Sequence, residues 1–113
     1  MGTLIPGEDG LSPEITKLTK ALAKDPKSKL FMPLAEEYVK IGMLEDAVAV
    51  LENGLKHYPT FVTARVALGR LYFQLENGAK ARTMLEEATK LSPENLLAHK
   101  TLARVYERAG AVD

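Results

Sequence analysis

The 113-residue sequence contains no cysteine, and its net charge is zero. Without cysteine the chain cannot form disulfides, thiolate zinc sites or a cysteine nucleophile. Its two histidines, His57 and His99, are too few for a three-histidine metal site. The balanced charge argues against an extended nucleic-acid surface, and no apolar run is long enough for a transmembrane helix. We therefore expect no metal, no cofactor, no nucleic acid and no membrane among its partners.

The sequence also lacks a recognisable catalytic constellation. Its glycines are single and not clustered, so there is no glycine-rich phosphate loop, and no Ser-His-Asp arrangement can be proposed. Glu36-Glu37 and Glu86-Glu87 are adjacent carboxylates on predicted helices, where neighbouring side chains point in different directions. We therefore expect that the chain is not an enzyme. Because its first residues do not have the features of a signal peptide, we expect it in the cytoplasm.

Proline and glycine divide the chain into six amphipathic segments. Residues 1–10 hold three glycines and a proline and are predicted to be a flexible tail. Short loops between the other segments indicate consecutive antiparallel helices, and no segment alternates with the period of a strand. Pro33 would disturb the second helix unless that helix begins near Leu30 or Phe31. The predicted helices cover residues 12–24, 28–41, 45–58, 61–75, 79–91 and 95–109.

Sliding the sequence over itself by 34 residues superimposes a set of apolar, small and proline positions. The matched pairs are Leu34 and Leu68, Ala35 and Gly69, Tyr38 and Tyr72, Ala47 and Ala81, Leu51 and Leu85, Gly54 and Ala88, and Pro59 and Pro93. A second shift reaches Leu102, Ala103 and Tyr106. A 34-residue period with Leu-small-x-x-Tyr in one helix and Ala, Leu, small and Pro in the next resembles the tetratricopeptide repeat.

The resemblance implies an all-α fold, a right-handed α-solenoid of antiparallel helix hairpins that bury their apolar faces by stacking. Residues 11–113 would form one domain. Within it, 11–25 would be a capping helix, 28–61 and 62–95 the two repeats, and 96–110 the first helix of a third repeat or a C-terminal cap. Small residues such as Gly69 would let the paired helices approach closely. We expect the turn at Glu76-Asn77-Gly78 to be displaced from the Gly42 turn of the first repeat.

The resemblance also implies a non-catalytic scaffold that binds a peptide or partner protein in a concave groove. Carried over position by position, that groove comprises Met32, Glu36, Val39, Val66, Arg70, Phe73, Lys100, Arg104 and Arg108. Its apolar strip (Met32, Val39, Val66, Phe73) and its cationic stripe (Arg70, Lys100, Arg104, Arg108) favour an acidic, partly apolar ligand. The competing interpretation is structural: the basic residues pair with Glu36 and Glu107, and Phe73 packs on its neighbours.

Three other functions are weighed against this one. The family's clamp for a chaperone C-terminal carboxylate is not expected, because Met32 and Glu36 stand where it needs Lys and Asn. Self-assembly, as a homo-dimer or within a longer array, could use an open face of the last helix at Leu102, Ala103, Val105 and Tyr106. RNA binding is remote, because the period is 34 rather than 35 and the net charge is zero.

Overall fold

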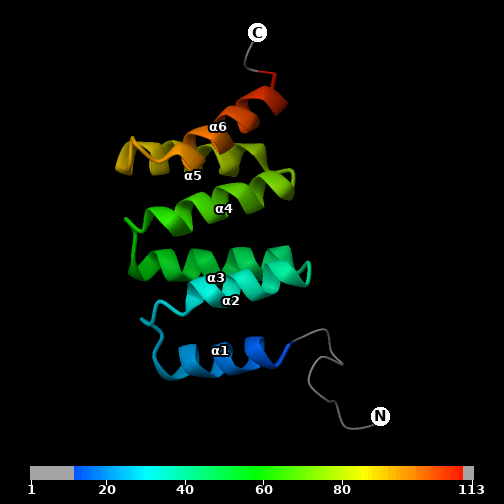
Figure 1. The fold of residues 1–113 in the computed structure, drawn as a ribbon, viewed down its shortest axis with the longest axis vertical. Helices are drawn as coiled ribbons and strands as arrows, with labels where there is room; N and C mark the ends of the chain where they lie inside the picture. Colours follow the sequence, from blue (N-terminus) through cyan, green and yellow to red (C-terminus); the bar gives the residue numbers. More distant parts are fainter. Residues whose placement is uncertain (1–11, 111–113) are drawn as a thin grey trace. The chain divides into compact units, whose positions relative to one another are not determined.

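The computed structural model describes residues 12–110, which form six α-helices and no strand (Figure 1). The helices are α1 Pro13–Lys24, α2 Phe31–Lys40, α3 Leu44–His57, α4 Val62–Gln74, α5 Gly78–Leu91 and α6 Leu96–Arg108. All six predicted helices are confirmed, with ends close to the predicted residues. The flexible tail predicted for residues 1–10 lies outside the described residues.

Three helices begin at a residue whose side chain caps the helix. The Ser12 hydroxyl accepts a hydrogen bond from the backbone N–H of Ile15 at 3.1 Å, and Asn77 and Asn95 cap α5 and α6 in the same way. These oxygens satisfy amides that have no partner inside the helix. Pro33 is the third residue of α2, where a missing amide hydrogen costs no intrahelical bond, which confirms the late start expected for this helix.

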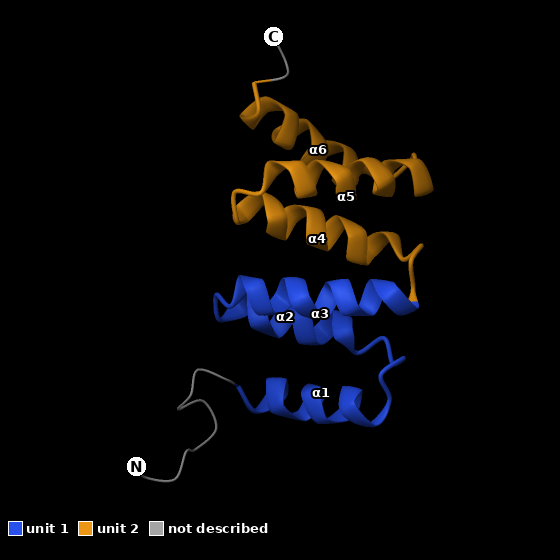
Figure 2. Ribbon diagram, turned by 180° about the vertical axis from the view of Figure 1, so that it is seen from behind, with its two compact units in different colours: residues 1–57 blue, residues 58–113 orange. Residues whose placement is uncertain are grey.

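The chain forms two compact units, residues 1–57 and 58–113 (Figure 2). In the first unit, α1 packs on α2, and α2 packs on α3. Ile15 and Leu18 of α1 meet Leu34 of α2 in a buried cluster, with Tyr38 against its edge. α1 therefore covers apolar side chains of α2, and its role as a capping helix stays a prediction.

The second unit is built on α4, which packs on both α5 and α6, while α5 also packs on α6. Leu68 of α4 and Leu85 of α5 are fully buried, and Ala81 of α5 is buried with them. On α6, Ala98 and Val105 are buried. The arrangement places the outer sides of α4 and α6, which carry most of the predicted site, next to each other.

Each hairpin contains one glycine that a side chain from the other helix covers. A Cβ added at Gly69 would lie 2.5 Å from Cγ of Leu85, and one added at Gly54 would lie 2.3 Å from Cδ2 of Phe31. Both contacts are too short for any Cβ. In the second repeat Arg65 replaces the Phe31 ring, and Ala88 takes the place of Gly54. The paired helices therefore approach closely, as predicted. In the first hairpin the glycine at the contact is Gly54 of α3, and in the second it is Gly69 of α4.

The turns that follow α2, α4 and α6 recur at the repeat period. Gly42, Glu76 and Gly110 follow the ends of α2, α4 and α6, are 34 residues apart, and have φ angles of 80°, 65° and 74°. The expectation that the second turn is displaced is therefore wrong. Gly78 does not form the turn but begins α5. The left-handed conformation closes a helix end most easily with glycine, so Glu76 occupies it at a cost of about 1 kcal/mol.

A polar cluster fastens α6 to α5. The Tyr106 hydroxyl donates a 2.5 Å hydrogen bond to Glu86, whose carboxylate also accepts from Nε of Arg82 at 2.9 Å. These two bonds, with that from Tyr106 first, lower the pKa of Glu86, and the bond to Glu86 raises the pKa of Tyr106. The adjacent Glu87 instead pairs with Arg65. As expected for neighbours on a helix, the two carboxylates reach different partners.

Replacing Gly69 with alanine should lower the free energy of unfolding by about 1–3 kcal/mol, because the new methyl group overlaps Leu85. Urea unfolding followed by circular dichroism measures the change. Gly78→Ala is the matched control, since a Cβ at Gly78 meets nothing within 4 Å, and it should cause no loss. A Gly69→Ala protein as stable as the wild type would contradict the close approach.

Replacing Tyr106 with phenylalanine should raise the pKa of Glu86 toward its ordinary value, because the strongest bond to its ionised form is lost. The side-chain carboxyl carbon of Glu86, followed by NMR as a function of pH, reports this shift. The bonds that lower the pKa of Glu86 stabilise the folded protein above the pKa of the unfolded state, and this stabilisation is lost as the pH falls. The variant lacks the strongest of these bonds, so its free energy of unfolding should fall less on acidification. An unchanged Glu86 titration would contradict the cluster.

Candidate functional site

The structure distributes the predicted groove residues over both units. Met32, Glu36 and Val39 lie on α2 in the first unit, where Met32 is half-buried and the other two are exposed. The remaining residues lie on two helices of the second unit that pack together: Val66, Arg70 and Phe73 on α4, and Lys100, Arg104 and Arg108 on α6. We therefore build the candidate site within the second unit.

Val66 does not belong to the surface that the sequence predicts. Its exposed fraction is 4%, so it takes part in packing and is not available to a ligand. The α4 helix contacts both α5 and α6, so more than one of its sides is covered. Buried residues on α4 accordingly do not follow a single stripe: Ala64, Val66, Leu68, Gly69, Leu71 and Tyr72.

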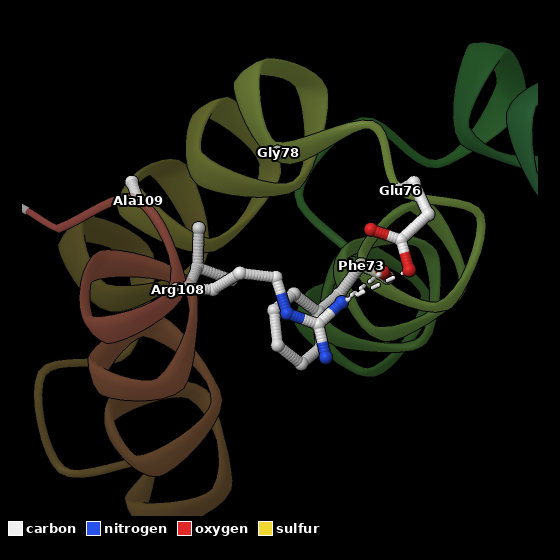
Figure 3. Close-up of a pocket in the computed structure, with 6 residues that line it drawn as sticks. Phe73, Glu76, Gly78, Arg108 and Ala109 are labelled. Atoms are coloured by element: carbon white, nitrogen blue, oxygen red, sulfur yellow. Dashed lines mark hydrogen bonds and ion pairs between the residues drawn. The ribbon is translucent and has the colours of Figure 1, made fainter.

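The centre of the candidate site is a contact between the ends of α4 and α6. The Arg108 guanidinium carbon lies 4.0 Å from the centre of the Phe73 ring, a distance typical of a cation–π interaction. The same guanidinium lies 3.4 Å from the Phe73 carbonyl oxygen and 3.4 Å from Oε2 of Glu76. Figure 3 shows Arg108 extended across Phe73 toward Glu76, with both polar contacts on one side of the guanidinium.

A hollow of about 210 Å³ lies at this contact. It is lined by Phe73, Glu76, Gly78, Val105, Arg108 and Ala109. The lining combines an aromatic ring and two aliphatic side chains with one cation and one carboxylate. A hollow of this composition suits a ligand group that has both an apolar part and a charge.

The other basic residues lie on the same faces as this contact. Residues three or four apart share a helix face, so Arg70 lies beside Phe73, and Lys100 and Arg104 lie in line with Arg108. Because α4 and α6 both end at the Phe73–Arg108 contact, they run parallel, and Arg70 and Arg104 lie about one turn back from it. We call Arg70, Phe73, Lys100, Arg104 and Arg108 the basic face.

The charges of the basic face are mostly unpaired. Arg70, Lys100 and Arg104 are exposed, and no ion pair to any of them occurs among residues 12–110. The expected pairing with Glu36 or Glu107 is not found there: Arg108 instead pairs with Glu76. The second half of the structural interpretation holds, since Phe73 does pack on a neighbour, the Arg108 guanidinium.

Arg65 and His99, at equivalent repeat positions, have structural partners instead. Nε of Arg65 donates to the carbonyl of Pro59 at 2.8 Å, and Nε2 of His99 lies 2.7 Å from the carbonyl of Pro93. Arg65 also pairs with Glu87, and its side chain is only 17% exposed. Both residues therefore stabilise the turns that precede their helices.

The open face predicted for the last helix is only partly present. Val105 is buried, and Tyr106 is held by Glu86, while Leu102 is half-buried and Ala103 is exposed. Val105 differs from the prediction because it lies inside the contact of α6 with the rest of the second unit.

Residues 12–110 contain neither a cluster of metal-ligating side chains nor a helix suited to span a membrane. No three His, Asp or Glu side chains in this range gather in a way that would hold a metal ion. Within the same range, none of the helices combines the length and the apolar character needed to cross a membrane.

Comparison with known proteins places these features in a family. Residues 38–91 match a family model described as a tetratricopeptide repeat. A peroxisomal targeting signal receptor of Saccharomyces cerevisiae is 39% identical over 67 residues, and a CTR9 homolog of Arabidopsis thaliana is 35% identical over 65 residues. The matches cover 59% and 58% of this chain but only 11% and 6% of those proteins. The chain therefore corresponds to a small part of these curated relatives.

Solved structures show the same fold over most of the chain. The crystal structure of MamA superimposes with a TM-score of 0.82 at 26% identity, covering 86% of this chain and 57% of MamA. The first tetratricopeptide domain of Spaghetti (RPAP3), solved with an HSP90 peptide, gives a TM-score of 0.81 at 21% identity over 85% of this chain and 77% of that one. The repeat period, the helix pairs and these similarities agree: residues 38–91 match the tetratricopeptide repeat family, and the chain has the all-α helical-repeat fold expected from its sequence.

Proposed function

We propose that this chain is a non-catalytic interaction scaffold whose basic face binds an acidic, partly apolar peptide segment of a partner protein. The observation that carries the proposal is a set of exposed cations without ion pairs on the helix faces that meet at an aromatic ring. Arg70 precedes Phe73 on α4, and Lys100 and Arg104 lie in line with Arg108, whose guanidinium lies over the Phe73 ring. Proteins of this repeat family are generally scaffolds rather than enzymes. The cytoplasmic location expected from the sequence stays a prediction.

The charges of α6 are unfavourable for the helix alone. Lys100, Arg104 and Arg108 follow one another at four-residue spacing, and each like-charge pair at that spacing costs an isolated helix about 0.2–0.5 kcal/mol. Arg108 is compensated by the C-terminal end of α6 and by Glu76, but Lys100 and Arg104 are not. A bound carboxylate would remove this repulsion, so binding of an acidic ligand would add to the stability of the face.

The hollow at Phe73 accounts for the apolar part of the proposed ligand. Phe73 is half-buried and Val105 is buried, so both are held in place by their neighbours, and an apolar side chain of the ligand could pack against them. Aromatic and arginine side chains in such a place are the usual residues that dominate binding energy. Charge would then bring the ligand to the face, and burial at Phe73 would hold it.

The structural relatives support a peptide ligand in general terms. The RPAP3 domain was solved with the peptide SRMEEVD, which is acidic and contains apolar residues. In this chain Met32 and Glu36 stand where the family's carboxylate clamp needs Lys and Asn, so we do not propose that particular ligand. The proposed binding uses the basic face of the second unit instead.

The proposal predicts that a fluorescein-labelled Glu-Glu-Leu-Glu-Glu-Leu-Glu peptide binds the wild-type chain. Arg104→Glu should weaken the affinity for this peptide by roughly tenfold or more, because an attraction between charges becomes a repulsion. Fluorescence anisotropy measures the affinity. Phe73→Ala should also weaken it, through loss of the apolar contact. Added salt should weaken binding to the wild type.

Two controls make the result specific. Lys90→Glu introduces the same charge change on α5, outside the basic face, and should leave the affinity close to that of the wild type. The peptide Gln-Gln-Leu-Gln-Gln-Leu-Gln has the same pattern without charge and should bind much more weakly. Equal binding by Arg104→Glu and Lys90→Glu would show that the basic face is not the ligand site.

A further inference from the structure

Glu76 is exceptional among the three turns that share the repeat period. Gly42 and Gly110 take the left-handed conformation without steric cost, whereas Glu76 takes it against the preference of any residue with a Cβ. A glutamate has no advantage over glycine for closing the turn itself. The reason for its presence must therefore lie in what its side chain does.

The Glu76 side chain reaches Arg108, the arginine whose guanidinium lies over the Phe73 ring. Its Oε2 atom lies 3.4 Å from a guanidinium nitrogen of Arg108, on the side where that guanidinium also meets the Phe73 carbonyl (Figure 3). Both charged side chains are largely exposed, at 77% for Glu76 and 53% for Arg108. A long, solvated pair of this kind holds its partners weakly.

The carboxylate of Glu76 thus lies where a ligand carboxylate would lie if it bound to Arg108. The position is beside the hollow, so a carboxylate there could be followed by an apolar side chain packed on Phe73 and Val105. Among the arginines and lysines of the basic face, Arg108 alone has an acidic partner within residues 12–110. The chain therefore already contains, at this point, the group that the proposed ligand would supply.

We propose that Glu76 is an internal competitor for the ligand: its carboxylate occupies Arg108 in the free protein, and an acidic peptide binds by displacing it. The inference rests on the proposed function and adds to it. It assigns Arg108 to a ligand carboxylate that is adjacent to an apolar residue, and it gives Glu76 the role of setting a threshold, so that peptides with a single weak acidic contact are rejected.

The structural alternative is that Glu76 merely fastens the turn after α4 to α6. The two roles differ in their consequences. A competitor, once removed, leaves tighter ligand binding and nearly unchanged stability. A fastening residue, once removed, leaves lower stability and unchanged or weaker ligand binding.

The test measures affinity for the same Glu-Glu-Leu-Glu-Glu-Leu-Glu peptide in Glu76→Gln and Glu76→Gly proteins. Glu76→Gln keeps the strained turn and removes the charge. It should bind the peptide about two- to fivefold more tightly, because the ligand no longer has to break an exposed ion pair to reach Arg108. Glu76→Gly should bind at least as tightly and should also be more resistant to urea than the wild type, because the strain is relieved.

Two further variants separate competition from a general change in charge. Glu94→Gln makes the same charge change at the opposite end of α6 and should alter the affinity much less. Arg108→Gln should weaken binding, and adding Glu76→Gln to it should give no further gain, since the residue for which the two carboxylates compete is gone.

The outcomes are distinct. Tighter binding in both Glu76 variants, absent in the Arg108→Gln background, supports the competitor. Wild-type binding with no gain in either Glu76 variant, or a gain equal to that of Glu94→Gln, overturns the inference and leaves the proposed function standing. Failure of the peptide to bind the wild type and every Glu76 variant overturns both.

Discussion

The close approach of paired helices is the constraint on which the rest of this structure depends. Gly69 lies directly beneath Leu85, and Gly54 beneath the Phe31 ring, at separations that exclude any larger residue. This spacing determines how each helix of a hairpin is rotated, and therefore which side chains point outward. In the second unit the outward side chains of α4 and α6 include Arg70, Arg104 and Arg108, so the basic face results from how α4, α5 and α6 pack together.

Positions equivalent by the repeat are structurally equivalent even where their residues differ. Arg65 and His99 both reach back to a proline carbonyl, although the first repeat has Phe31 at that position. Gly42 and Glu76 close the same turn with the same backbone conformation. Where the backbone is the same and the residue has changed, the side chain is available for another purpose, which is why Glu76 is informative.

The helices and the period could be predicted from the sequence because Pro, Gly and the capping residues act locally. Ser12 and Pro13 begin a helix wherever it later packs, and the 34-residue recurrence needs no knowledge of contacts. Two aspects of the site could not be predicted. The burial of Val66 depends on tertiary packing that the sequence pattern does not show, and the Glu76–Arg108 pair joins residues 32 apart across the contact of α4 with α6. The sequence does single out Glu76, since a 34-residue shift aligns it with Gly42 and Gly110, but it does not indicate Arg108 as the partner.

The central claim is that the basic face of the second unit binds an acidic peptide, and amide chemical-shift mapping by NMR tests it most directly. Titrating the labelled chain with the Glu-Glu-Leu-Glu-Glu-Leu-Glu peptide should move the amide signals of residues 70–76 on and after α4 and of residues 104–110 on and after α6. Signals around Thr83 on the outer side of α5 should stay in place. Shifts confined instead to the exposed leucines Leu96 and Leu97 at the start of α6 would contradict the account.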